Sequence, residues 1–164
     1  MTGEILKITI LCVGKIKEKF FAEAIAEYSK RLSRYVRLEI CEVADEKTPE
    51  NASEAVESQI KEKEAERLLA KWDESAFTIV LAIEGKQFSS EDFAAKLDSL
   101  TVYGKSHIQF VIGGSLGLAN DIIKKGDLLL SFSKMTFPHQ LMRVVLLEQI
   151  YRSYRIIKGE PYHK

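Results

Sequence analysis

Five strand-like segments alternate with helix-like segments along the chain, and this alternation limits the fold more than any other feature of the sequence. Four of the segments are apolar runs with little polar alternation, which is typical of strands covered on both faces. The fifth, Val36–Val43, alternates apolar with charged residues, as a half-exposed strand does. Strands that alternate with helices predict an α/β domain with a mostly parallel sheet flanked by helices. The four apolar runs are Ile5–Val13, Phe77–Ile83, Ile108–Ile112 and Leu128–Phe132.

The segments between these strands carry helix signals. Ser89 or Ser90, followed by two acidic residues, marks a helix start, because serine caps free amides and acidic residues favour the first turn. Pro138 suits the first turn of the final helix. After the Phe77–Ile83 strand, Glu84 to Lys86 is predicted to turn the chain. The predicted helices cover about residues 18–34, 53–72, 89–100, 118–125 and 138–157.

Length and composition indicate one domain, residues 1–164, with 46% hydrophobic residues and a sizeable core. No run approaches the roughly 20 apolar residues of a membrane helix, and the first residues lack a signal-peptide pattern. We therefore predict a cytoplasmic protein without a membrane partner. Cys12 and Cys41 fit no metal or redox spacing, so we predict reduced core cysteines and no metal site.

The formal net charge is zero, but the charges are unevenly distributed. Basic residues exceed acidic ones in 1–37 and in 134–164, whereas acidic residues exceed basic ones in 45–76. Such a chain can present a basic face to a polyanion, although an ordinary solvated surface is the simpler explanation of the pattern. Charge thus permits a nucleic-acid partner without requiring one.

Three loops follow strand ends in the second half of the chain, and ligands of parallel sheets bind at such ends. They are Leu81–Gly85, Gly113–Gly117 and Phe132–Phe137. The glycine loop has neither dinucleotide-binding nor P-loop spacing. Its adjacent glycines indicate close backbone approach, either to a ligand or to another segment, and taken alone they are more simply a tight turn. Backbone groups exposed by three neighbouring loops could recognise an adenine or a ribose, so we predict a pocket there.

The last thirty residues contain two of the three histidines. His139 opens a helix, where the backbone dipole favours the neutral imidazole, and Arg143 lies four residues on, on the same face. Chain ends usually fray, so the ending Tyr162-His163-Lys164 makes sense only if something holds or uses it. This segment predicts an active site assembled from a helix and a tail.

Four segments of the second half combine these residues in a specific order and spacing, and two segments of the first half extend the pattern. Over nearly its whole length the chain thereby resembles the bacterial ribosomal RNA large subunit methyltransferases of the SPOUT class that methylate N3 of a pseudouridine in 23S rRNA. The leader Met1–Glu4 is the one departure from their usual start, and we expect it to be harmless. The matching segments are residues 111–117, 130–143, 148–152, 159–164, 13–15 and 45–49.

The resemblance implies a C-terminal trefoil knot, which periodicity alone would not predict. It also implies S-adenosylmethionine as methyl donor, no metal, 23S rRNA as substrate within the ribosome, and a homodimer. In that dimer the tail of one subunit completes the site of the other. The implied cofactor contacts are Leu81, Gly113, Phe132, Ser133, Lys134, Met135, Thr136 and Phe137.

The reaction requires removal of a weakly acidic imide proton and stabilisation of the resulting charge. His139 or His163 can be the base, and Arg143 or Arg152 can be the cation. Tyr162 can stack on the target base or anchor the tail. The sequence does not decide between the histidines. His139 could instead bond to backbone at the helix start, Arg143 could pair with Glu148 or solvent, and the tail could be disordered.

Two other functions fit the same residues less fully. A non-catalytic, dimeric RNA- or ribosome-binding module needs the basic ends and the final helix but not three ligand loops. An enzyme that uses another adenosine-containing ligand needs the same pocket. Trp72 is predicted to cap the core partially, and His107 to have no special role. The cations that are candidates for RNA phosphates, with ordinary helix surface as the alternative, are Lys15, Lys17, Lys19, Arg31 and Arg34.

Overall fold

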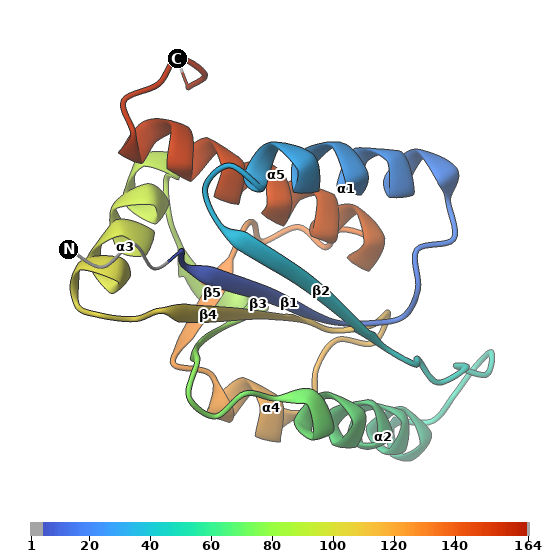
Figure 1. Cartoon of the computed structure of the whole chain (residues 1–164). Coiled ribbons are helices and arrows are strands. Elements are labelled where there is room, and N and C mark those ends of the chain that lie inside the picture. The colour runs from blue at the N-terminus through green and yellow to red at the C-terminus, as the bar shows by residue number, and fades with distance from the viewer. Residues whose placement is uncertain (1–4, 164) are drawn as a thin grey trace.

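The computed structural model describes residues 5–163 as one five-stranded sheet between two layers of helices (Figure 1). Every strand pairing is parallel, and the strand order is β2-β1-β4-β3-β5. The predicted α/β class with a parallel sheet is confirmed. The strands are β1 Lys7–Val13, β2 Arg37–Val43, β3 Phe77–Gln87, β4 His107–Ile112 and β5 Leu128–Ser131. The helices are α1 Lys19–Leu32, α2 Glu54–Lys71, α3 Ser90–Val102, α4 Asn120–Lys125 and α5 His139–Ile157.

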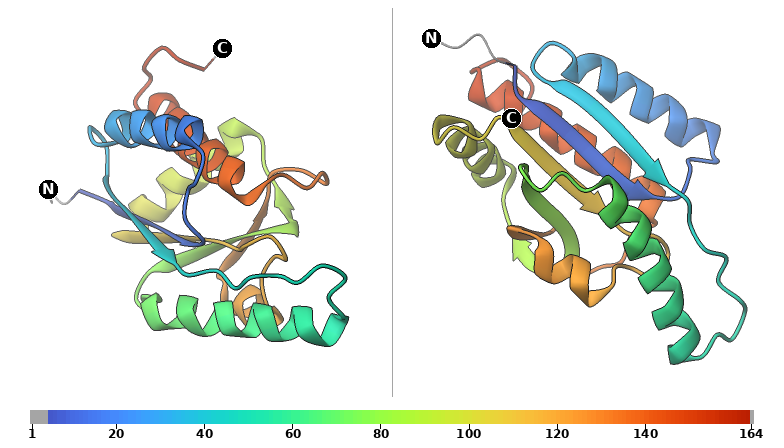
Figure 2. Two further views of the ribbon diagram at one scale, coloured as in Figure 1. Left: turned by 90° about the vertical axis from the view of Figure 1, so that its right-hand side faces the viewer. Right: turned by 60° about the horizontal axis from the view of Figure 1, so that its bottom comes forward.

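Helices α1, α3 and α5 cover one face of the sheet, and α2 and α4 cover the other (Figures 1 and 2). Because side chains alternate along a strand, β1 serves both layers. Ile8 and Ile10 lie in the core beneath α1, α3 and α5. Leu11 and Val13 lie in the smaller core with Leu68 of α2. All five of these residues are fully or almost fully buried, as the apolar runs predict.

The boundaries of most helices and strands differ from the predicted ones by one or two residues. Ser89 is the N-cap of α3, and its side chain accepts a hydrogen bond from the Asp92 amide at 3.0 Å. Pro138 stands one position outside α5 as its N-cap. Cys12 and Cys41 are both free thiols in strands. Trp72 packs partly buried against the α2 side of the core, as predicted.

The predicted turn at Glu84–Lys86 is wrong, because β3 continues through it to Gln87. Its pairing with β5 shifts register, so that both Leu81 and Lys86 lie opposite Leu130. Gly85 makes this possible: a Cβ there would stand 2.7 Å from the Leu129 carbonyl carbon. Without a side chain, the backbone of β3 can bulge and still stay close to β5.

The prediction that His107 has no special role is also wrong. It begins β4, and its ring bridges two distant segments, with Nδ1 3.0 Å from Asp73 Oδ2 and Nε2 2.8 Å from Thr9 Oγ1. These contacts tie β1 and β4 to the end of α2. None of the three residues lies at the strand ends that carry the predicted pocket, so His107 has a structural role.

The carboxyl ends of the parallel strands meet at one edge of the sheet, and β4 lies between β1 and β3. The glycine loop after β4 is therefore flanked by the loops after β1 and β3. Strand order alone does not establish a threaded chain, so the trefoil knot stays a prediction. Within residues 5–163, no helix has the length and apolar character needed to cross a membrane.

Candidate active site

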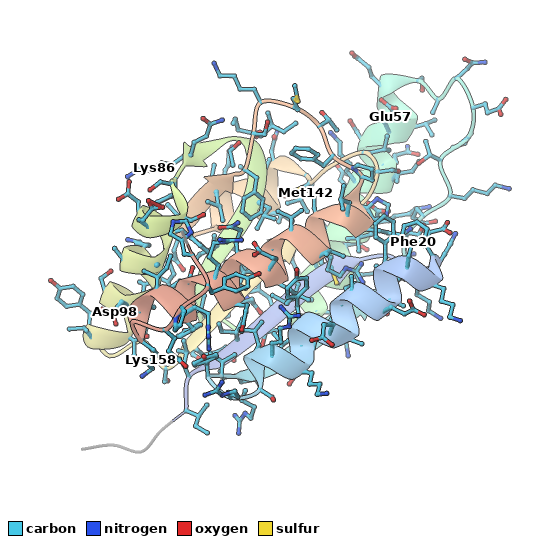
Figure 3. The ribbon with its side chains drawn as sticks, turned by 90° about the horizontal axis from the view of Figure 1, so that it is seen from above. Phe20, Glu57, Lys86, Asp98, Met142 and Lys158 are labelled. Atoms are coloured by element: carbon cyan, nitrogen blue, oxygen red, sulfur yellow. The ribbon has the colours of Figure 1, made fainter. Side chains whose placement is uncertain are left out.

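A cavity of about 970 Å³ opens at the carboxyl edge of the sheet, where the three predicted loops meet. The β3 bulge contributes Leu81 to Glu84, the segment after β4 contributes Gly113 to Leu118, and the segment after β5 leads into α5. His139 and Met142, in the first turn of α5, also line it. Figure 3 shows Met142 at this end of the helix. The predicted convergence of three distant loops on one pocket is confirmed.

Seven of the eight predicted cofactor residues line this cavity, and Lys134 does not. Lys134 is exposed on the segment between β5 and α5. Its neighbour Met135 is 72% exposed although its side chain is apolar, and Phe137 is 37% exposed. Two apolar side chains at a cavity mouth are available to a ligand or to another chain. Whether these residues bind the cofactor stays a prediction.

The glycine loop is held by its own contacts. The Gly117 amide donates to the Gly114 carbonyl at 3.0 Å, and Gly117 has a φ of 86°, which favours glycine. A Cβ on Gly113 would stand 2.8 Å from Leu118 Cγ and 2.9 Å from the Gly117 carbonyl carbon. Gly113 must therefore be small because the loop folds back onto it. The close approach that the sequence indicates is made first of all by another segment of the chain.

The segment from β5 to α5 is also locally ordered. The Ser131 hydroxyl donates to the Ser133 carbonyl at 3.1 Å, and the Met135 amide donates to the Ser133 hydroxyl at 2.9 Å. These bonds form a compact turn that presents Thr136 and Phe137 to the cavity. Ser131 and Ser133 thus position the residues that follow them at the cavity.

His139 reaches the cavity wall from the first residue of α5. Its Nε2 lies 3.7 Å from where a Cβ would stand on Gly14, at the end of β1. Burial lowers the pKa of His139, the positive charges of Arg143 and Lys17 lower it further, and Asp45 opposes them. The imidazole is therefore neutral near pH 7 and able to accept a proton.

Arg143 shares the helix face of His139, as predicted, but it does not line the cavity. Its side chain is 1% exposed, and its guanidinium bonds to Glu42 Oε2 at 2.5 Å and to the Gly14 carbonyl at 3.1 Å. The predicted alternative partner, Glu148, instead binds Arg152 at 2.7 Å. Arg143 therefore lies behind His139, out of contact with the cavity.

The tail lies against α5, far from the cavity of its own chain. Tyr162 donates its hydroxyl to Glu148 Oε2 at 2.7 Å, and His163 Nδ1 lies 3.1 Å from Arg152 Nη1. His163 Nε2 also lies 3.1 Å from a Glu91 carboxylate oxygen at the start of α3. A disordered tail is thus excluded as far as His163; Lys164 lies outside the described residues. Burial and the Glu148 hydrogen bond raise the pKa of Tyr162, so its hydroxyl stays protonated.

The separation between tail and cavity follows from helix geometry. Arg152 stands thirteen residues beyond His139 on a continuous helix, a rise of about 20 Å. The structure therefore brings His139 to the cavity and gathers Tyr162, His163 and Arg152 elsewhere. One chain does not unite all the predicted catalytic residues.

The predicted RNA-contacting cations also divide into two groups. Arg31 pairs with Glu27 at 2.8 Å and Arg34 with Glu160 at 3.7 Å, at the end of α1 away from the cavity. The other group, on the loop after β1 and the start of α1, lies near the cavity, because the Lys17 amide bonds to Gln140 Oε1 at 3.2 Å. Its members are Lys15, Lys17 and Lys19.

Glu64 was not singled out by the sequence. It lies on the apolar stripe of α2, four residues from both Ile60 and Leu68, and is only 5% exposed. Oε2 accepts the Glu46 amide at 3.0 Å, whereas Oε1 has no partner within residues 5–163. Oε1 also lies 3.3 Å from where a Cβ would stand on Gly114, directly beneath the glycine loop. A carboxylate at an apolar helix position was the signal that could have revealed it.

Residues 6–163 match the family model described as a predicted SPOUT methyltransferase. The chain belongs to the SPOUT methyltransferase family. The predicted family is thereby confirmed, and the cavity at the carboxyl edge is the candidate active site of a methyltransferase.

Individual relatives support this membership. A ribosomal RNA large subunit methyltransferase H of Bifidobacterium adolescentis is 65% identical over 97% of this chain and the whole of that protein. A Methanococcus maripaludis relative with the same name, marked as provisional, is 62% identical over the same shares. The structure of a probable methylase family protein from Haemophilus influenzae Rd KW20 shares the fold. Its TM-score is 0.53 at 14% identity, over 98% of this chain and 71% of that one.

Proposed function

We propose that this SPOUT methyltransferase transfers a methyl group from S-adenosylmethionine to N3 of a pseudouridine in 23S rRNA within the cytoplasmic ribosome. The observation that carries the proposal is the position of His139, a histidine with a lowered pKa, in the wall of the cavity formed by the three loops. The names of the relatives support ribosomal RNA as the substrate.

The cavity fits the methyl donor in size and chemistry. Its volume of about 970 Å³ lies within the range of small-molecule sites. Apolar side chains such as Leu81 and Phe137 suit an adenine face, and the hydroxyls of Ser133 and Thr136 suit a ribose. The Glu84 carboxylate at the wall suits a cationic ligand. These groups would hold S-adenosylmethionine, which supplies an activated methyl electrophile when bound.

The chain's own residues then have two tasks. They must hold the acceptor nitrogen in line with the methyl group and accept the imide proton. Neutral His139 at the cavity wall can accept that proton at Nε2 or Nδ1. His163 of the same chain cannot, because it lies beside Arg152 and Glu91.

We infer that the site is completed in a homodimer through α5, the face onto which Figure 3 looks. Leu146, Leu147 and Ile150 of this helix are fully buried within one chain. Leu141, Val144 and Val145 remain partly exposed between the cavity end and Glu148. An apolar stripe on a helix that is already packed favours a second copy. An antiparallel pair centred near Val145 would place residue 139 of one chain opposite about residue 151 of the other.

This register would bring the partner's Tyr162 and His163 to the cavity that holds His139. The lysines at 15, 17 and 19, near the same end of α5, would meet rRNA phosphates and make binding salt-dependent. The short chain offers little area for sequence readout, so we expect the substrate to be recognised by the shape of the folded rRNA.

The test is methyl incorporation from S-adenosylmethionine into ribosomes from cells that lack the enzyme, with mass mapping of the modified nucleotide. We expect one new methyl group at N3 of a 23S pseudouridine, and much less in a short unstructured oligonucleotide. Calorimetry provides the control for the rival functions. Failure to bind S-adenosylmethionine would favour a non-catalytic module, and preference for another nucleotide would favour a different enzyme.

A further inference from the structure

An ion pair between buried Arg143 and a partly exposed carboxylate joins three elements directly behind His139. Arg143 of α5 bonds to Glu42 of β2 and to the carbonyl of Gly14, the residue that follows β1. The fork geometry of a guanidinium allows it to hold two acceptors in fixed directions at once. Nε of Arg143 has no partner within residues 5–163. Within these residues, the bonds to Glu42 and Gly14 are therefore the hydrogen bonds that hold the guanidinium.

The Gly14 end of this contact is itself tightly placed. Gly14 has a φ of 91°, and its amide donates to the Val43 carbonyl at 2.8 Å. Its carbonyl accepts the hydrogen bond from Arg143 at 3.1 Å. Three residues on, the Lys17 amide bonds to Gln140 of α5 at 3.2 Å. The loop after β1 is thus attached to the first two turns of α5 at two points.

His139 stands over the centre of this arrangement. A Cβ placed on Gly14 would lie 3.7 Å from His139 Nε2 and 3.9 Å from Asp45 Cβ and Cγ. The imidazole therefore fits against a glycine that has no side chain to displace it. Any slippage of α5 relative to Gly14 would move the ring relative to the cavity.

We propose that Arg143 is a positioning residue, whose contacts with Glu42 and Gly14 fix the first turn of α5 against the ends of β1 and β2 and so hold His139 at the cavity wall. This proposal rests on the proposed function only in the experiments that measure methyl transfer. The role differs from the one predicted from sequence, in which Arg143 itself stabilises charge on the substrate.

The proposal has an electrostatic consequence that can be measured separately. The charged groups that face His139 are Arg143 from its own helix, Lys17 from the loop after β1, and Asp45 from the loop after β2. Removing the Arg143 cation should raise the pKa of His139. Removing the Glu42 carboxylate should lower it, because the buried cation then lacks its counter-charge. Opposite shifts from the two ends of one ion pair are the signature of this arrangement.

The experiment is a proton NMR titration of the three histidines in the full chain. Arg143→Gln should shift the His139 titration to higher pH and Glu42→Gln to lower pH. Arg143→Lys should keep the wild-type titration but speed amide exchange at Lys15 to Lys17, because an ammonium cannot hold both acceptors. Arg155→Gln, the same change at the far end of α5, is the matched control and should leave His139 unchanged.

Methyl transfer supplies the second readout. Arg143→Gln should lower the turnover at pH 7 by about 10²-fold, which is the cost of misplacing a reacting group by about 1 Å. It should also shift the fall in rate at low pH to higher pH, because the pKa of His139 rises. Arg143→Lys should recover the wild-type position of this fall.

If Arg143→Gln abolishes transfer while the His139 titration and loop exchange stay wild-type, Arg143 acts on the substrate and the proposal is overturned. If Arg143→Gln does not fold, the other two variants decide. The proposal is overturned if Glu42→Gln leaves the pKa of His139 unchanged and Arg143→Lys leaves amide exchange at Lys15 to Lys17 unchanged. Inactive wild-type protein would refute the proposed function instead, and the NMR comparison would still decide the role of Arg143.

Discussion

His139 and Arg143 show how residues on the same helix face acquire different roles. Both occupy that face one turn apart, yet His139 lines the cavity and Arg143 is buried behind it. The difference arises because β2 presents Glu42 directly beneath α5. The long side chain of Arg143 can reach this carboxylate, whereas the shorter imidazole of His139 stays at the cavity wall.

His139→Asn tests the proposed role of His139 as the base. The change preserves size and polarity, so we expect cofactor affinity and fold to be retained and turnover to fall by roughly 10²–10⁴-fold. The lowered pKa of His139 determines how the wild-type rate of methyl transfer should depend on pH. The rate should be constant above about pH 6.5, the ordinary value, and should fall only as the pH drops through the lower folded value. Initial rates between pH 5 and 8 check both expectations, and a small loss in the variant would remove His139 as the base.

Glu64→Gln tests the buried carboxyl beneath the glycine loop. Burial raises the pKa of Glu64. Stability contributed by the protonated form is present below the unfolded pKa of about 4.5 and is lost as pH rises through the higher pKa of the folded state. An amide does not ionise, so the stability of the variant should depend less on pH above about 4.5. Urea unfolding at pH 5 and pH 8 measures this, and equal pH dependence in both proteins would contradict it.

At the scale of elements, the site depends on irregularities in regular structure. The bulge in β3 and the closed turn after β4 bring backbone to the cavity that a straight strand or a longer loop would not. Both irregularities require glycine, at Gly85 and Gly113, because a Cβ would collide with backbone less than 3 Å away.

Gly113→Val should therefore abolish binding of S-adenosylmethionine. The cause is deformation of the loop, since the new side chain meets Leu118 and Gly117. We expect a loss of about 1–3 kcal/mol in the free energy of unfolding, as for other overpacked sites. Gly104→Val is the control for lost stability without a deformed cavity loop. Gly104 has a φ of 89°, so valine is strained there, but nothing in residues 5–163 lies within 4 Å of its Cβ position and it does not line the cavity, so cofactor affinity should be retained. Calorimetry and thermal unfolding measure the two effects, and wild-type affinity in Gly113→Val would contradict the assignment of this loop.

At the scale of the whole molecule, the predicted catalytic residues are divided between two ends of one helix. His139 opens α5, whereas Tyr162 and His163 pack near Glu148 and Arg152. A single chain cannot bring these groups together without unfolding the tail. The proposed symmetric, antiparallel dimer would bring them together without any change within either chain.

Mixed dimers test this arrangement. A His139→Ala chain keeps its tail, and a chain truncated after Pro161 keeps His139, so each should be inactive alone. A mixed dimer contains one cavity with His139 and the partner's tail, and the mixture should regain part of the wild-type methyl incorporation. A truncated chain that is active by itself would show that the tail is structural. Full inactivity of a verified mixed dimer would show that the two groups do not act in one site.

The sequence by itself determined the helices, the strands, their parallel α/β arrangement and the meeting of three loops at one edge. These features follow from periodicity and from the rule that parallel strands end together, which act over short distances along the chain. The tertiary structure alone decided that β3 continues beyond Glu84, that His107 joins Thr9 to Asp73, and that Arg143 pairs with Glu42. Each depends on a contact between residues far apart in sequence, and a local pattern contains no information about which distant partner a side chain will meet.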